Sequence, residues 1–400
     1  MRYARSAARV RAGAVLVVVA AVVAGVGLAQ SPAPARPALV ERWVRGNVPD
    51  GWLCSGKVAV GDHAEMTDDA LADLRGLSAS GGATVAAQAP ALWHYVWPRD
   101  ASFAAAAFAV SGHVDDAVRV LDFLAAVQHD DGTFEARYHT DGTPVADGRA
   151  PQLDSSGWVL WALATVVDAA PADEQAALSD RFAVLRQRGV SAIEAAIGPD
   201  GTVRASPDYW ETKTSTLTLG TLAPLLAGAR AAGEDALADR LAAVLADEFA
   251  AYGYPRLSRT SAQDAAVAMT SPAFLGQWPP GARDAAARAQ TALTTGAGGI
   301  KPGEKWKDDG ISWTPETALF AYAWASDGQD DRAAALLAWL DAHRTGAGAL
   351  SEKVLDDGSP AGPAPLGWTG ALVVLTQAEL GALVPAAQVY PQCASTSAGG

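Results

Sequence analysis

The sequence predicts an all-α fold, an (α/α)6 toroid or barrel made of six helical hairpins. Almost charge-free helical segments alternate with amphipathic ones along the chain. The charge-free segments begin at intervals of roughly 50 residues, a period typical of a repeated helical hairpin. A helix that is apolar on every side must be covered on every side, so an inner ring of such helices needs an outer one. An open solenoid is the competing architecture, but its hairpins are usually shorter than these.

Each kind of segment recurs six times. The charge-free segments are 101–112, 155–167, 214–228, 261–269, 316–325 and 366–377. The amphipathic segments are 66–77, 114–128, 173–197, 234–252, 282–293 and 329–343. In 114–128, for example, Val114, Val118 and Leu121 keep the spacing of one helix face. This alternation predicts one partly exposed helix for each buried helix.

The N-terminal 29 residues have the pattern of a secretory signal peptide. Four arginines precede an apolar run over 14–28, and Gly27 and Ala29 supply a small-x-small cleavage site. An uncleaved anchor is the alternative, although the run is short for a membrane span. We therefore expect a secreted or cell-envelope protein. The predicted regions are a signal peptide (1–29), an N-terminal tether (30–60), the toroid domain (61–390) and a C-terminal tail (391–400).

The charge balance excludes several classes of partner. The formal net charge is −14 at pH 7, and removal of the four arginines of the signal peptide would move it to −18. Because the chain is this acidic and its Lys and Arg are scattered, we expect no binding to nucleic acid or to an anionic membrane surface. The six histidines show no metal-ligand spacing and no Cys/His cluster exists, so we expect no metal and no cofactor.

The only two cysteines are Cys54 and Cys393, near the two ends of the mature chain. An even number of cysteines in an exported protein predicts a disulfide. Closure of a ring brings its first and last units together, so the two sulfur atoms can meet. Two unpaired buried thiols are the alternative.

An unusual stretch, WHYVWPRD over 93–100, comes immediately before the first charge-free segment. Pro98 and a capping residue at Asp100 predict the start of a helix. Arg99 and Asp100 then lie at the mouth of a buried helix, beside aromatic rings. Because a sugar presents one apolar face and a fixed set of hydroxyls, this combination indicates a pocket for a sugar. An ordinary helix cap with a local ion pair is the alternative.

Other polar and aromatic residues are concentrated in the stretches that precede the remaining charge-free segments. In a toroid these stretches open on one end of the ring, together with 93–100, and form one funnel. The candidate substrate-binding residues are Arg99, Asp100, Trp97, Trp93, Tyr95, Trp210, Gln152, Asp154, Trp306 and Lys301.

An aromatic funnel with several carboxylates fits the cleavage of a glycosidic bond. One carboxylic acid protonates the leaving oxygen, and another carboxylate activates water. The acid needs a raised pKa, which contact with an aromatic surface supplies, and Glu211 follows Trp210. The base must stay ionised, which suits Glu352 in its polar stretch. The residues alone leave other acids open as alternatives: Glu135, Glu304 and Glu316.

Several motifs together resemble glycoside hydrolase family 15, the glucoamylase and glucodextranase family. They are YVWPRD over 95–100, WE over 210–211, SEK over 351–353 and PLGW over 365–368. The resemblance covers roughly 67–380. It implies an (α/α)6 barrel and inverting exo-hydrolysis that releases glucose from the non-reducing ends of α-glucosides.

Carried over to this sequence, the resemblance makes Glu211 the general acid and Glu352 the general base. Arg99 and Asp100 would hold hydroxyls of the terminal glucose, and Trp97 would line that subsite. Gln152 and Asp154 match the family's Pro-Gln-x-Asp stretch. Two departures bear on specificity, since the family commonly has Tyr where Trp93 stands and often an acid where Thr212 stands.

Two other classes of function remain open at this point. One is a catalytically silent carbohydrate-binding protein that keeps the pocket. The other is an α-glucoside-active toroid enzyme of different specificity, such as a trehalase or an isomalto-oligosaccharide or dextran glucohydrolase. A glycoside phosphorylase of related fold would lack the base because phosphate attacks directly, so Glu352 favours water as the nucleophile.

Overall fold

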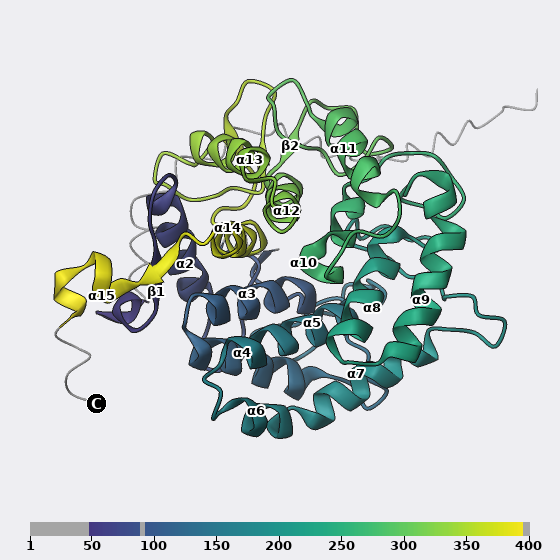
Figure 1. Ribbon diagram of the computed structural model, residues 1–400, viewed down its shortest axis with the longest axis horizontal. Coiled ribbons are helices and arrows are strands. Elements are labelled where there is room, and N and C mark those ends of the chain that lie inside the picture. The colour runs from purple at the N-terminus through teal and green to yellow at the C-terminus, as the bar shows by residue number, and fades with distance from the viewer. Residues whose placement is uncertain (1–47, 89–92, 395–400) are drawn as a thin grey trace, which may run out of the picture.

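The computed structural model describes residues 48–88 and 93–394, which form a double ring of helices (Figure 1). The inner ring contains α3 (Pro98–Val110), α5 (Asp154–Ala169), α8 (Leu219–Ala231), η4 (Ala265–Thr270) with α10 (Pro272–Leu275), α12 (Thr314–Ala325) and α14 (Gly367–Glu379). The outer ring contains α2 (Ala64–Leu77), α4 (Val114–Val127), α6 (Gln175–Arg181) with α7 (Ala183–Ala195), α9 (Asp235–Glu248) with η3 (Ala250–Tyr252), α11 (Ala282–Leu293) and α13 (Asp330–Ala342). The (α/α)6 toroid predicted from the sequence is confirmed.

The ring is closed by α14. This helix packs against its chain neighbour α12, and also against α3 and α2 from the beginning of the domain. Every other inner unit contacts the inner units on both sides of it. The six charge-free segments therefore lie inside, as their composition requires.

Small residues allow the inner helices to approach each other closely. In α3 every residue except Val110 is buried, and half of these buried residues are alanines. Between α5 and α8 two glycines meet. A side chain on Gly157 would lie 2.1 Å from the Pro224 carbonyl oxygen, and one on Gly228 would lie 2.6 Å from the Gly157 Cα. These contacts are shorter than any real Cβ contact, so substitution of either glycine would push the two helices apart.

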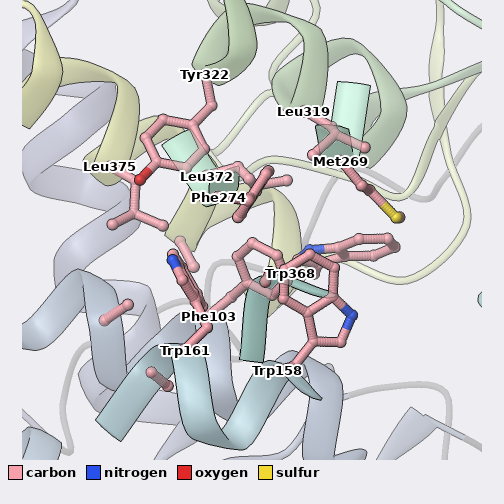
Figure 2. Packing of buried hydrophobic residues seen from close by; sticks show 14 of the residues in the cluster. Phe103, Trp158, Trp161, Met269, Phe274, Leu319, Tyr322, Trp368, Leu372 and Leu375 are labelled. Atoms are coloured by element: carbon pink, nitrogen blue, oxygen red, sulfur yellow. The ribbon is translucent and has the colours of Figure 1, made fainter. Parts of the chain in front are cut away.

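Aromatic side chains fill the centre of the ring. Figure 2 shows rings from α5, α10 and α14 packed around Phe103 of α3, while Tyr322 of α12 packs on Phe274 of α10. The Phe103 ring lies 4.9 Å from that of Trp158 and 5.0 Å from that of Trp161, centroid to centroid. The barrel is thus plugged by its own core, and a ligand can enter only from an end of the ring.

The fourth inner segment differs from the sequence prediction. A helix was expected over 261–269, but the chain is irregular up to Asp264 and then forms the 3-10 helix η4 and the one-turn α10. Ser271 separates the two in an extended conformation, with ψ 167°. Because Pro272 follows it, Ser271 is disfavoured in the α region, and a continuous helix cannot form.

The third inner helix starts later than the predicted segment 214–228. It begins at Leu219, because the Thr218 hydroxyl accepts a hydrogen bond from the Thr221 N–H and caps the helix. Asp100 was expected to cap the first inner helix, and this is wrong. Trp97 is the N-cap residue and Pro98 the first helical residue, so Asp100 lies inside the first turn.

The two ends of the described chain are joined beside the ring. Strand β1 (Lys57–Ala59) pairs antiparallel with β5 (Leu383–Pro385), and the short helices η1 (Trp52–Ser55), α15 (Ala386–Val389) and η5 (Pro391–Cys393) surround this pair. Cys54 and Cys393 form a disulfide with a Cα–Cα distance of 4.9 Å. The predicted signal peptide and most of the predicted tether lie outside the described residues. Within the described ranges, no helix has the length and apolarity needed to cross a membrane.

Replacement of both cysteines by serine is expected to lower the free energy of unfolding by about 2–5 kcal/mol. The bond closes a loop with a sequence separation of 339, so its loss frees a large part of the unfolded chain. Denaturant titrations of the wild type and of the double variant measure the difference. Wild-type protein with added reductant is the control. Equal stabilities would mean that the β1–β5 contacts alone hold the two ends together.

Candidate active site

A pocket of about 180 Å³ opens where the inner helices begin. Its walls come from the start of α3, from the loop before α8, from the start of α12 and from the loops around β3 (Lys353–Val354) and the start of α14. The lining residues are Trp93, Trp97, Arg99, Asp100, Tyr209, Trp210, Glu211, Trp306, Trp313, Pro315, Glu316, Glu352, Lys353, Leu366 and Trp368. This volume is below the usual range for pockets that hold drug-sized ligands, and it suits a single small ring.

Arg99 and Asp100 form the base of the pocket at the first turn of α3. The Arg99 Nη2 and Asp100 Oδ2 atoms are 3.3 Å apart, and the Arg99 guanidinium lies 5.1 Å from the centre of the Trp368 ring. Both side chains are buried. A fixed donor group beside a fixed acceptor group is suited to holding neighbouring hydroxyls of one sugar.

Gln152 and Asp154 lie behind Arg99 and hold it in place. The Arg99 Nη1 donates to Gln152 Oε1 at 3.0 Å and to Asp154 Oδ2 at 3.3 Å. Burial raises the pKa of Asp154 to about 6, although the Arg99 charge opposes this shift. Neither residue is part of the pocket wall, so they act on a ligand only through Arg99.

Glu211 lies in a tight turn before α8. Its N–H donates to the Asp208 carbonyl oxygen at 2.7 Å, and the Trp210 N–H donates to the Asp208 side chain at 3.1 Å. The Asp208 carboxylate is fixed in turn by Arg256 at 2.8 Å. Glu211 itself has φ 55°, a left-handed conformation that is uncommon for a residue with a long side chain. The turn thereby directs the Glu211 side chain into the pocket.

Two donors contact the Glu211 carboxylate. The Trp97 indole N–H donates to Oε1 at 2.5 Å, and the Arg149 guanidinium pairs with Oε2. Glu211 keeps an exposed side-chain fraction of 22%. Hydrogen bonds and a positive charge both favour the ionised form of a carboxyl group.

Glu352 is held by a small antiparallel sheet in the order β2 (Ser312–Trp313), β3 (Lys353–Val354), β4 (Pro360–Ala361). The Glu352 carbonyl accepts from the Thr314 N–H at 3.0 Å, and its N–H donates to the Pro363 carbonyl at 2.9 Å. The backbone of Glu352 is therefore fixed from both sides of the strand.

The Glu352 side chain is almost completely buried, with 3% of it exposed. Burial raises its pKa above the ordinary value, and the Lys353 ammonium, 3.0 Å from Oε2, opposes this shift. The same ammonium lies 4.4 Å from the centre of the Trp313 ring. Lys353 thus reduces the electrostatic cost of a carboxylate in an apolar place.

Glu316 is a third carboxyl group of the pocket. It lies in the first turn of α12, it is 2% exposed, and its Oε2 has no hydrogen-bond partner among the described residues. Burial, together with the nearby carboxyl groups of Glu352 and Asp264, raises its pKa to about 8. At neutral pH Glu316 is therefore a neutral carboxylic acid that can donate a hydrogen bond.

Glu316→Gln is expected to remove part of the pH dependence of stability. The unfolded chain ionises Glu316 near 4.5, whereas the folded protein keeps it protonated up to about 8. The contribution of protonated Glu316 to the free energy of unfolding is fully present below pH 4.5 and is lost as the pH rises to 8. The loss is up to roughly 1.4 kcal/mol per pH unit. Thermal melts across this range should show the variant gaining on the wild type. Glu304→Gln, at an exposed position, is the control, and parallel curves for all three proteins would contradict a buried neutral Glu316.

Tryptophans form the remaining walls. The Trp210, Trp306 and Trp313 rings meet edge to face, with centroid distances of 4.8 and 5.3 Å. On the opposite side of the pocket, Trp93 stacks on Trp97 at 5.8 Å. The funnel of aromatic side chains expected from the sequence is present, and its rings offer apolar faces to a sugar.

Not every predicted residue reaches the pocket. Tyr95 packs edge-on against Trp97 and His139, away from the pocket wall. Lys301 lies outside the wall and faces Asp308 at 3.8 Å. Of the alternative acids, Glu135 faces His129 at 3.7 Å and Glu304 accepts from the Gln263 N–H, so neither lines the pocket.

Sequence reasoning missed several groups at the site. Tyr209 lines the pocket, and its hydroxyl donates to Asp264 at 2.7 Å. Burial raises the pKa of Asp264 to about 7. Asp100, Asp154, Asp208 and Asp264 recur at nearly the repeat length, one at or just before the start of each of the first four inner units, and this spacing could have identified Asp264. No sequence signal indicates Arg149, which lies in the long loop between α4 and α5.

No protein-family model and no curated protein matches this sequence. Several solved structures are similar. A variant glycosidase in complex with glucose is 22% identical with a TM-score of 0.68, over 81% of this chain and 100% of that one. A bacterial glucoamylase complexed with acarbose is 19% identical with a TM-score of 0.60, over 78% of this chain and 55% of that one. Glucoamylase from Saccharomycopsis fibuligera is 12% identical with a TM-score of 0.63, over 82% and 97%.

At these identities the likeness shows the fold. The chain has a glucoamylase-like toroid, and its pocket lies at the end of the ring where the inner helices begin. One fold can carry many activities, so the activity of this protein depends on the residues of its pocket.

Proposed function

We propose that this protein is a glycoside hydrolase of the family 15 type, which releases glucose from the non-reducing ends of α-glucosides with inversion of configuration. One observation carries the proposal: Glu211 and Glu352 line the same pocket from opposite sides of the ring. Glu211 precedes α8 and Glu352 precedes α14, and two inner units separate these helices in either direction. Two carboxyl groups that act on opposite faces of a sugar require such a placement.

In the proposed reaction Glu211 is the general acid and Glu352 the general base. Glu211 protonates the glycosidic oxygen as its bond to the anomeric carbon breaks. Glu352 accepts a proton from a water molecule, whose oxygen attacks the anomeric carbon from the other face. Lys353 beside Glu352 supports the ionised form that a base needs. Glu316, neutral and directed at the pocket, is suited to donate a hydrogen bond to the sugar.

The shape of the pocket supports exo-cleavage. The plugged core closes its inner end, so only the terminus of a glucan chain can enter. Arg99 and Asp100 would hold hydroxyls of the terminal glucose, while Trp97 and Trp313 cover its apolar faces. The fixed Arg99–Asp100 pair supplies both a donor and an acceptor, which a vicinal pair of hydroxyls can satisfy.

Incubation with a panel of α-linked disaccharides and dextran, followed by proton NMR, tests this proposal. The first product is expected to be β-glucose, which then mutarotates. α-Glucose as the first product would overturn inversion. Saturable sugar binding without turnover on any member of the panel would favour a catalytically silent carbohydrate-binding protein. Preference for trehalose or isomaltose within the panel would assign the specificity.

We also propose that the protein is exported. The Cys54–Cys393 disulfide supports this, since such bonds persist in oxidising compartments. Mass spectrometry of the protein from the medium or the cell envelope should find a mature N-terminus at Gln30. An intact residue 1 on membrane-bound protein would favour the uncleaved anchor.

A further inference from the structure

The contacts of the two proposed catalytic carboxyl groups are the reverse of what their roles require. Glu211, the proposed acid, is partly exposed and contacts a cation and an indole N–H, which favour its ionised form. Glu352, the proposed base, is buried, which favours its protonated form. Because an acid must hold a proton when the glycosidic bond breaks, something has to change at Glu211 when substrate binds.

Arg149 is the group that can change. It comes from the loop between α4 and α5, its side chain is 37% exposed, and it is not part of the pocket wall. It therefore approaches the Glu211 carboxylate from outside the pocket. Because the pocket suits a single sugar ring, the sugar on the leaving-group side of a bound chain would also extend outside it. By contrast, the Trp97 side chain is buried in the pocket wall and cannot withdraw.

Arg149 already has a second charged partner, Asp147, which would hold it after its release from Glu211. Its Nε donates to Asp147 Oδ2 at 3.1 Å, and its own N–H donates to Asp147 Oδ1 at 3.2 Å. Asp147 also pairs with Arg137, which lies over the Tyr95 ring at 4.6 Å and over the Trp97 ring at 5.0 Å. Arg149 thus keeps a charged partner when it lets go of Glu211, so its release does not leave an isolated cation.

We propose that Arg149 is a displaceable counter-ion of Glu211, which the sugar on the leaving-group side of the cleaved bond removes. This inference rests on the proposed function. With Arg149 in place Glu211 is a carboxylate. When the leaving-group sugar displaces the guanidinium, Glu211 takes up a proton from solvent and donates it to the glycosidic oxygen as the bond from this oxygen to the anomeric carbon breaks. Glu352 accepts a proton from the water whose oxygen attacks that carbon. Glu352 later releases this proton to solvent, which balances the proton that Glu211 took up. Arg149 is a positioning residue, since it acts through Glu211.

The charged groups around Glu211 define what must be controlled in a test. Arg149 contacts it directly, and Asp147 and Arg137 lie beyond Arg149. The Asp208–Arg256 pair lies behind its turn. The other charged or ionisable groups of the pocket wall are Arg99, Asp100, Glu316, Glu352 and Lys353. Of all these groups, Arg149 alone bonds the Glu211 carboxylate among the described residues, so its removal is the selective change.

The kinetic test compares Arg149→Gln with the wild type on maltose. The alkaline limb of kcat/KM reports the free enzyme and that of kcat the complex. Loss of Arg149 should move the alkaline limb of kcat/KM to higher pH by about one unit. This is the low end of the pKa change that a neighbouring opposite charge causes, because the Arg149–Glu211 pair is partly exposed. The limb of kcat should stay in place, because Arg149 is already displaced in the complex.

Two further variants make the test specific. Arg149→Lys keeps the charge and should restore the wild-type profile. Arg181→Gln removes an exposed arginine that pairs with Asp122 on the outer ring, and it should leave both limbs unchanged. A kcat limb that moves as far as the kcat/KM limb would overturn displacement. An unmoved kcat/KM limb would overturn any role for Arg149 at Glu211.

A measurement without turnover separates this inference from the proposed function. The carboxyl ¹³C signal of Glu211, assigned by its loss in Glu211→Gln, is titrated in the free protein and with methyl 4-thio-α-maltoside, an uncharged disaccharide whose sulfur linkage resists hydrolysis. The pKa of Glu211 should rise in Arg149→Gln, because an opposite charge is removed, and the thiomaltoside should raise it in the wild type alone. An unchanged pKa in the free variant overturns the inference. If no α-glucoside is cleaved, the proposed function fails, while this titration still decides whether Arg149 controls Glu211.

Discussion

Glu211→Gln is expected to lower kcat/KM for maltose by about 10²–10⁴-fold, the usual contribution of a general acid. The amide keeps the shape of the side chain and its contact with Trp97, but it has no proton to give to a departing sugar oxygen. On α-glucosyl fluoride, whose leaving group needs no proton, the loss should be less than about tenfold. Initial rates on the two substrates give both numbers.

The contrast between the two substrates is what identifies an acid. Glu135→Gln, which alters a half-exposed acid outside the pocket, is the matched control and should retain wild-type rates on both substrates. Equal losses on maltose and on the fluoride in Glu211→Gln would show that Glu211 binds or orients the sugar and does not protonate the leaving group.

Glu352→Gln is expected to lose about 10²–10⁴-fold in rate on both substrates, because water must be activated whatever the leaving group is. The pH profile of the wild type gives a second readout. Burial raises the pKa of Glu352, and a base works only when ionised. The wild-type kcat/KM should therefore fall as the pH drops through a value above the ordinary range of a glutamate.

Glu316→Gln is the informative comparison, since Glu316 is the other buried glutamate of the same wall. It should retain the acidic limb of the profile and most of the rate on the fluoride, because the amide can still donate a hydrogen bond. Loss of activity in Glu316→Gln together with retention in Glu352→Gln would make Glu316 the base.

The sequence alone determined the architecture of this protein. A segment such as 155–167 has no charged residue to place in water, so it has to be covered on all sides, and a regular alternation of such segments with amphipathic ones has few solutions other than a double ring. The same holds locally at α3, where Pro98 and the alanines that follow it specify a buried helix directly after an aromatic stretch. The motifs around Arg99, Glu211 and Glu352 could be found because the residues within each motif are neighbours in the chain.

The tertiary structure decided everything that depends on residues distant in the chain. The inward position of Asp264 follows from packing in the closed ring, which the local sequence pattern does not record. The pKa of Glu316 near 8 arises from its burial and from the nearby carboxyl groups of Glu352 and Asp264. It could not be predicted from the α12 segment alone. The contact of Arg149 with Glu211 joins loops 62 positions apart. The protonation state of a carboxyl group depends on the groups within a few ångströms of it, and in this protein those groups are brought together only when the ring closes.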